Sequence, residues 1–168
     1  MDRQHLMARL KKAWSDFQQS YAGLSDSQMM TSGVTGDWSV RDILVHVTTW
    51  EQEALKHLPT ILNGGRPPRY SVTHGGINRF NRPVTEQKRG FTLREARRDV
   101  EEIHQRLIRF IDSVPEAQFC SETPFRRRLR LDTYGHYLQH AAAIRSWRSQ
   151  QLNGTRNHDS GTEKETFG

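Results

Sequence analysis

The chain has 168 residues, a length typical of one domain with a sizeable hydrophobic core. Hydrophobic residues make up 34% of it, and its longest apolar run, Ala141 to Ile144, is far shorter than the roughly 18 apolar residues of a membrane-spanning helix. The single cysteine, Cys120, excludes an intrachain disulfide framework and a multi-cysteine zinc site. Residues 1–6 carry mixed charges and are unlike a secretory signal, which predicts a cytoplasmic location and no membrane partner.

Basic residues outnumber acidic ones by 25 to 19, which gives a formal net charge of +6 and makes nucleic acid a partner to consider. The basic residues are spread along the whole chain, however, and the one tight cluster is the arginine run 126–128 with Arg130. Such a run beside Pro124 is typical of a solvated turn. The charge pattern therefore disfavours nucleic acid as a partner.

The first helix is predicted between residues 6 and 21. One face of it is formed by apolar residues at spacings of four, four, three and four: Leu6, Leu10, Trp14, Phe17 and Tyr21. Gly23 ends this pattern, and Ser25 with Gln28 predicts a short helical turn after it. The stretch 31–37 contains two glycines and is expected to be a loop.

A second long helix is predicted from the capping-box pattern of Ser39 and Asp42. Its apolar positions follow at helical spacing: Val40, Ile43, Leu44, Val47, Trp50, Ala54 and Leu58. The pattern ends near Pro59, and between residues 63 and 90 glycines and prolines replace it. This composition predicts a long crossover connection with one short helix at about residues 77–87.

A third helix is predicted from the capping box of Thr92 and Glu95 to the break at Pro115. Its apolar stripe is the most regular in the chain: Ala96, Val100, Ile103, Leu107, Phe110 and Val114. Residues 116–130 contain Pro124 and are expected to form a second connection. A fourth helix is predicted from about Leu131 to about Gln150.

Four helices, long connections after the second and third, and no strand pattern predict an all-α four-helix bundle whose topology is not simple up and down. We expect residues 1–152 to form this domain. Residues 153–168 are polar and aperiodic, which predicts a disordered tail. An exposed apolar face on such a bundle would favour a homodimer.

Three of the eight histidines are placed to meet inside this bundle. His136 and His140 lie four residues apart, so that their side chains stand one turn apart on the fourth helix. His46 falls on the apolar stripe of the second helix. Three neutral imidazoles form a ligand set for zinc, nickel, copper or iron and leave a coordination position for water or substrate. The alternative is that they are hydrogen-bonded core residues. We place His104 on the polar side of the third helix.

Two segments carry a resemblance to a known family. Residues 36–47 (GDWSVRDILVHV), followed by Trp50, and residues 132–140 (DTYGHYLQH), followed by Trp147, resemble the second-helix and fourth-helix signatures of the DinB/YfiT-like superfamily of metal-binding four-helix bundles. Residues 77–81 (INRFN) are similar to its ClbS/DfsB-like branch. The resemblance covers residues 3–150 and implies that His46, His136 and His140 bind a divalent metal.

The resemblance implies one of two functions, and both act on a small electrophilic molecule. The first is a metal-dependent enzyme, either a hydrolase or a transferase that uses a low-molecular-weight thiol as a second cofactor; zinc and nickel are the metals expected. The alternative is a ClbS-like protein that confers resistance by sequestering a small molecule without a catalytic metal. The family also favours a homodimer. The sequence assigns no catalytic residue.

Four further residues are candidates for binding the substrate. Glu53 lies seven residues after His46, on the same helix face, and is the candidate partner of the nucleophile. Arg145 is a candidate for binding an acidic thiol cofactor, Tyr134 for donating a hydrogen bond, and Trp50 for a pocket wall. Solvated helix faces and core packing are the alternative interpretations of all four.

Overall fold

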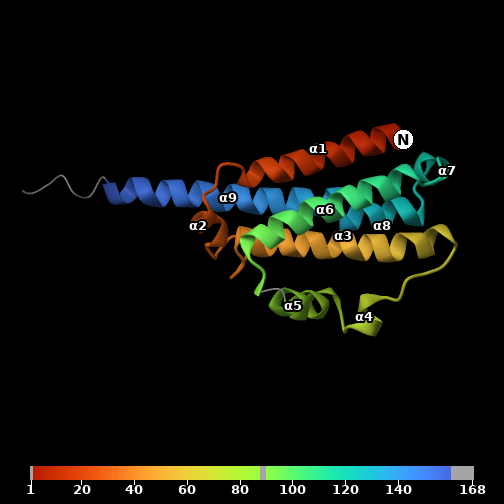
Figure 1. Cartoon of the computed structure of the whole chain (residues 1–168), viewed down its shortest axis with the longest axis horizontal. Helices are drawn as coiled ribbons and strands as arrows, with labels where there is room; N and C mark the ends of the chain where they lie inside the picture. The colour runs from red at the N-terminus through yellow and green to blue at the C-terminus, as the bar shows by residue number, and fades with distance from the viewer. Residues whose placement is uncertain (1, 88–89, 160–168) are drawn as a thin grey trace, which may run out of the picture.

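The computed structural model describes residues 2–87 and 90–159. Within these ranges every regular element is a helix (Figure 1). Four long helices run side by side: α1 (Arg3–Tyr21), α3 (Val40–Leu62), α6 (Leu93–Asp112) and α9 (Tyr134–Asp159). Helix α1 packs against α9, and α3 packs against α6. The predicted all-α four-helix bundle is therefore confirmed.

The helices begin at the predicted caps. The Ser39 side chain accepts a hydrogen bond from the Asp42 amide while Asp42 bonds back to the Ser39 amide, and Thr92 and Glu95 do the same at the start of α6. Ser25 and Gln28 form a third capping box at α2 (Asp26–Met30), the short helical turn predicted after Gly23. These reciprocal contacts satisfy amide donors that a helix leaves unpaired at its first turn.

The core lies between the apolar stripes of the long helices. Each stripe turns inward because residues three and four apart share a helix face. The fully buried residues of this core include Leu6, Leu10, Phe17, Ile43, Leu44, Leu58, Leu107, Ile111 and Ile144.

The crossover between α3 and α6 carries two short helices, α4 (Tyr70–Thr73) and α5 (Ile77–Gln87). Figure 1 shows both of them alongside α3, on the side away from α1, and α5 contacts α3. The short helix predicted at about residues 77–87 is thus present. Phe80 of α5 is buried. Tyr70, Ile77 and Asn81 of the connection form one wall of the site described below.

The second predicted connection is helical in the structure. Residues 116–130 contain α7 (Ala117–Cys120) and most of α8 (Pro124–Asp132), which packs against α3 and α9. Pro124 occupies the first turn of α8, and the Thr123 side chain caps it by accepting a hydrogen bond from the Arg126 amide. A proline in the first turn starts a helix rather than ending one. The arginine run therefore lies on a helix and not in a solvated turn.

The fourth bundle helix is broken between α8 and α9. Thr133 has φ −131° and ψ −105°, outside the helical region. At the other end, α9 continues to Asp159, beyond the predicted limit near Gln150, so that the backbone of residues 153–159 is helical. The remainder of the predicted tail, residues 160–168, lies outside the described residues. No helix in the described part of the chain is long and apolar enough to span a membrane.

Candidate functional site

The structure brings His46, His136 and His140 together. The Nε2 atom of His136 lies 2.9 Å from Nε2 of His46 and 2.9 Å from Nε2 of His140. One ring nitrogen from each histidine falls within a cluster whose members lie no more than 4.8 Å apart. Helix α3 contributes one ring, and α9 contributes two rings that stand one turn apart.

The three rings are held in their neutral form. Burial lowers the pKa of all three, and the charge of neighbouring histidines adds to this effect for His46 and His136. The resulting pKa values are about 2 for His46, about 3 for His136 and about 4 for His140. At neutral pH each ring therefore offers one nitrogen lone pair, the form in which histidine binds a metal.

This donor set fits a divalent transition metal. Nε2 of His136 belongs to both close pairs, and it carries either one N–H or one lone pair, which makes a good hydrogen bond in only one of them. Hydrogen bonds among the rings therefore cannot satisfy all three Nε2 atoms. A cation at their centre accepts all three lone pairs when the protons lie on Nδ1. Nδ1 of His136 is buried and has no hydrogen-bond partner among the described residues. Zinc and nickel both accept such a set and keep a coordination position open.

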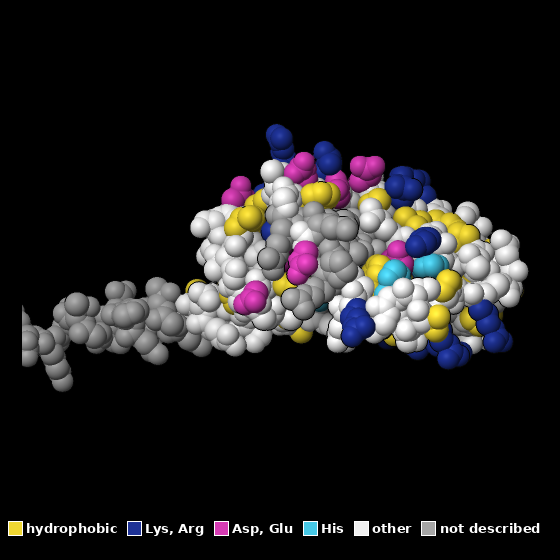
Figure 2. Space-filling model, turned by 90° about the horizontal axis from the view of Figure 1, so that it is seen from below, with side chains coloured by type: hydrophobic (Ala, Val, Ile, Leu, Met, Phe, Trp, Pro, Cys, Tyr) yellow, Lys and Arg dark blue, Asp and Glu magenta, His cyan; other side chains and the backbone are white. Residues whose placement is uncertain are grey.

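A pocket of about 510 Å³ opens beside the three histidines. Its walls come from α3, the crossover helices, α8 and α9. Besides the histidines it is lined by Trp50, Tyr70, Ile77, Asn81, Arg128, Leu131, Asp132 and Gln139. Figure 2 shows the face that carries the crossover, with hydrophobic and basic side chains around it. His46, His136 and His140 all line the pocket itself. The imidazoles are therefore accessible to a small molecule.

Of the four substrate-binding candidates, Trp50 lines this pocket, and its Nε1 donates to Oδ1 of Asn81 at 3.1 Å. Tyr134 and Arg145 do not line it. Tyr134 is buried beneath the guanidinium of Arg9, and Arg145 donates to the Asp16 carbonyl of α1 at 2.9 Å. Arg145 follows His140 by five residues, which turns it roughly 140° around the helix, away from the site.

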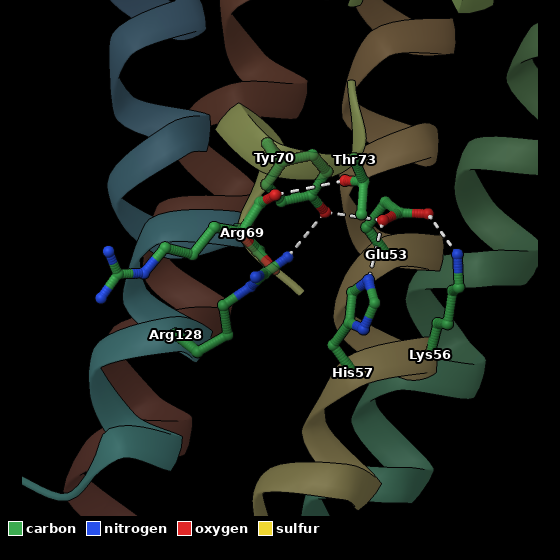
Figure 3. A network of polar contacts seen from close by, with 8 residues as sticks. Glu53, Lys56, His57, Arg69, Tyr70, Thr73 and Arg128 are labelled. Carbon is green, nitrogen blue, oxygen red and sulfur yellow. Dashed lines mark hydrogen bonds and ion pairs between the residues drawn. The ribbon is translucent and has the colours of Figure 1, made fainter. Parts of the chain in front are cut away.

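Glu53 does not line the pocket, but it belongs to a polar network (Figure 3) with Tyr70 and Arg128, which do line it. The Tyr70 hydroxyl donates to Oε2 of Glu53 at 2.6 Å and accepts from Nη2 of Arg128 at 2.9 Å. His57 Nε2 lies 3.0 Å from the same carboxylate oxygen, and Lys56 Nζ lies 3.6 Å from Oε1. Burial opposes the charge of Glu53, but the Tyr70 hydrogen bond and the two nearby bases hold its pKa below the ordinary value.

The pocket contains an acidic residue that the sequence analysis did not single out. Asp132, the last residue of α8, has a side chain that is 3% exposed and accepts a hydrogen bond from Nε of Arg128. Burial raises its pKa to about 6, although the charge of Arg128 opposes this shift. Asp132 precedes His136 by four residues, a spacing that would place both side chains on one face of a continuous helix. The break at Thr133 interrupts the helix, so this spacing alone does not predict their relative positions.

His104 is buried, contrary to its predicted place on the polar side of the third helix. Its Nδ1 lies 2.8 Å from Oε1 of Glu51, and its ring stacks on Trp14 with centroids 3.7 Å apart. The Tyr137 hydroxyl donates to the same Glu51 oxygen. This network belongs to the bundle interior and not to the pocket. The helical pattern could not reveal it, because polar residues that pair in the core look like surface residues in a sequence.

The fold and the imidazole cluster define an all-α bundle with a candidate metal centre facing a pocket. Residues 9–143 match the family model of the DinB superfamily, and the chain belongs to this superfamily. No curated protein matches the sequence.

Solved structures of three proteins share the fold. The sibling lethal factor precursor DfsB is 15% identical, with a TM-score of 0.72 over 90% of this chain and 97% of its own. The colibactin self-resistance protein ClbS, in complex with double-stranded DNA, is 11% identical, with a TM-score of 0.74 over 88% and 96%. An uncharacterised protein from Escherichia coli UTI89 is 12% identical, with a TM-score of 0.72 over 90% and 95%. The predicted resemblance to the ClbS/DfsB-like branch is confirmed at the level of the fold.

Proposed function

We propose that this protein is a metal-dependent enzyme that acts on a small electrophilic molecule, either as a hydrolase or as a transferase of a low-molecular-weight thiol. The observation that carries this proposal is the convergence of three neutral imidazole Nε2 atoms beside a pocket of about 510 Å³. Without a metal, hydrogen bonds among the three rings cannot satisfy all three Nε2 atoms, and an incompletely paired polar atom in a largely desolvated site costs free energy. Bound zinc or nickel removes that cost.

His46, His136 and His140 would hold the ion. A divalent ion held by neutral ligands lowers the pKa of a water or thiol toward neutrality and polarises an electrophile. The chain's own groups shape the rest of the site: Trp50 and Tyr70 form aromatic walls that exclude water from the substrate. The pocket volume is in the range of small-molecule sites.

Metal content tests the proposal first. Protein purified without a histidine tag, or metal-free protein dialysed against zinc or nickel, should hold about one equivalent of metal by elemental analysis. His136→Ala should lose it, because the remaining two imidazoles no longer enclose the ion. His5→Ala, which changes an exposed histidine on α1, is the matched control and should keep the metal. Wild-type protein that takes up neither metal at neutral pH would contradict the proposal.

Turnover of an electrophile tests it second. Styrene oxide is a suitable probe, because water opens its ring to a diol and a thiol opens it to a thioether. Zinc-loaded protein should accelerate its consumption either alone, as a hydrolase, or only with N-acetylcysteine, as a thiol transferase. The metal-free protein and His136→Ala should leave the uncatalysed rate unchanged.

The likeness in fold to the self-resistance protein ClbS supports a second candidate function, the sequestration of a small molecule without a catalytic metal. In that case the histidines are polar core residues, and His46→Ala leaves ligand affinity nearly unchanged. ClbS is found in complex with double-stranded DNA, and DNA is therefore the macromolecular partner to test here. DNA binding would show as a complex that weakens steeply with salt. A homodimer and a cytoplasmic location stay proposals as well.

A further inference from the structure

We propose that Asp132 is the acid–base catalytic residue of this pocket. Its carboxylate takes the proton of the attacking water or thiol and delivers it to the atom that leaves the electrophilic carbon. This inference rests on the proposed function and deepens it, because it assigns a proton-transfer role to one residue of that site.

The position of Asp132 sets it apart from every other acidic side chain described. Among the described residues that line the pocket, it is the only one with a carboxyl group, and it shares this pocket with His46, His136 and His140. It ends α8, and the break at Thr133 separates it from the helix that carries two of the histidines. A general base must lie in the same cavity as the proton that it removes, and Asp132 meets this requirement.

The orientation of Asp132 is fixed by a chain of contacts that spans three elements. Nε of Arg128 donates to Oδ2 of Asp132, while Nη2 of Arg128 donates to the Tyr70 hydroxyl, which in turn donates to Glu53. Figure 3 shows Arg128 and Glu53 reaching the Tyr70 hydroxyl from opposite sides. The network thus connects α3 and the crossover helix α4 to α8. Glu53 and Tyr70 are positioning residues, since their hydrogen-bonded contacts reach Asp132 through Arg128.

The charges around the two carboxylates assign them different roles. Burial raises the pKa of Asp132 to about 6, the charge of Glu53 adds to this effect, and Arg128 opposes it. The three histidines that face the same pocket are neutral. A group that titrates close to neutral pH both accepts and returns a proton efficiently. Glu53, whose pKa lies below the ordinary value, stays ionised and holds the network in place.

The ring opening of styrene oxide shows where each bond and proton goes. The oxygen of water, or the sulfur of N-acetylcysteine, forms a bond to a ring carbon while the bond from that carbon to the ring oxygen breaks. The nucleophile's proton passes to Asp132 and from there to the ring oxygen, which becomes a hydroxyl group. No oxidant or reductant is needed, and Asp132 returns to its starting form.

The first experiment follows protonation in the metal-free protein, independently of turnover. Infrared difference spectroscopy across a pH titration should show a carboxyl group that titrates close to pH 6 in the wild type. This signal should be absent from Asp132→Asn and present in Asp16→Asn, the control on α1. A titration that is unchanged in Asp132→Asn, or a wild type without such a signal, would overturn the proposal.

The second experiment measures styrene oxide consumption by the zinc-loaded protein. Asp132→Asn keeps an acceptor for Arg128 but cannot take up a proton, and it should lower kcat by about 100-fold or more at an unchanged zinc content. Tyr70→Phe should shift the infrared titration and lower kcat less, because it loosens Arg128 and keeps the base. Full activity in Asp132→Asn would overturn the catalytic role of Asp132 but would leave the proposed function standing. A wild type that binds no metal and is inactive would instead remove the proposed function, and with it the inference.

Discussion

Gly135 sits where the chain turns from α8 into α9, one residue before His136. A Cβ atom placed on Gly135 would lie 2.9 Å from the carbonyl oxygen of Arg130, closer than real Cβ contacts allow. Because that neighbour is backbone and cannot move aside easily, only glycine fits the junction without strain. The position of His136 therefore depends on a residue that has no side chain.

We expect Gly135→Ala to lower the free energy of unfolding by about 1–3 kcal/mol, the range for overpacked sites. It should also weaken zinc binding, since relief of the clash displaces the start of α9. Chemical denaturation and zinc titration measure the two effects. Gly90→Ala is the control, because a Cβ at Gly90 meets no atom within 4 Å. Equal stability of the two variants would show that the junction tolerates a side chain.

At the scale of single residues, the sequence predicted the imidazole cluster because its geometry is local. His136 and His140 are one turn apart on one helix, and His46 follows the apolar stripe of another. The sequence pattern does not indicate Asp132 and Arg128, because their importance comes from tertiary contacts with Tyr70 and Glu53. No spacing along one helix reveals such a network. Arg145 was a candidate because of its positive charge. Its position five residues after His140 directs its side chain toward α1 and away from the histidines.

Between elements, a buried polar network fixes how three of the long helices meet. Glu51 of α3 is fully buried, and one of its oxygens faces His104 of α6 and the Tyr137 hydroxyl of α9. Tyr137 follows His136 directly, so that the network also sets the rotation of α9. The contacts therefore support the site from behind.

Glu51→Ala should lower the free energy of unfolding by about 3 kcal/mol, because the His104 and Tyr137 groups would stay buried without a partner. Thermal and urea unfolding provide the measurement. Glu102→Ala, which removes an exposed carboxylate on α6, should change stability by less than about 0.5 kcal/mol. If the two variants are equally stable, the network contributes nothing to helix packing.

The elements that sequence patterns predicted well are those with a cap and a long apolar stripe. Helices α3 and α6 begin at their predicted capping boxes, since both signals lie within one segment. Helix α8 is not predicted by the pattern, because it has only nine residues and contains Pro124, a residue type more often found where helices break. A short segment contains too few periodic positions to outweigh that proline. Tertiary packing against α3 and α9 stabilises α8 instead.

For the whole molecule, the lowered pKa values of the three clustered histidines predict a stability that depends on pH when no metal is bound. The pKa values of His46, His136 and His140 are lowered to about 2, 3 and 4. The unfolded chain, in which histidine titrates near about 6.5, therefore binds more protons than the folded chain below that pH. Stability should fall as the pH decreases, by at most about 1.4 kcal/mol per pH unit for each histidine. The raised pKa values of Asp132 and Glu51 act in the opposite direction and offset part of this loss.

Urea unfolding of metal-free protein between neutral and mildly acidic pH measures this slope. Replacement of His136 and His140 together by glutamine should make it shallower, because only one buried histidine of the cluster would remain. A double variant with the wild-type slope would mean that other groups cause the acid sensitivity.

The bundle itself tolerates wide changes in sequence, as TM-scores of 0.72 and 0.74 at identities of 15% and 11% demonstrate. Apolar stripes and helix caps specify this fold, and many side chains satisfy them. The histidine cluster tolerates fewer changes in sequence, since it needs three imidazoles at the same level along two helices. The fold thus supplies the frame, and the chemistry of this chain depends on a few residues within it.

X-ray absorption spectroscopy of the zinc-loaded protein identifies the atoms around the ion and therefore tests whether the three histidines hold it. We expect three imidazole nitrogens at about 2.0–2.1 Å and one further light ligand, with imidazole scattering reduced in His136→Ala. Zinc without imidazole ligands, or a spectrum that does not change in that variant, would contradict this expectation.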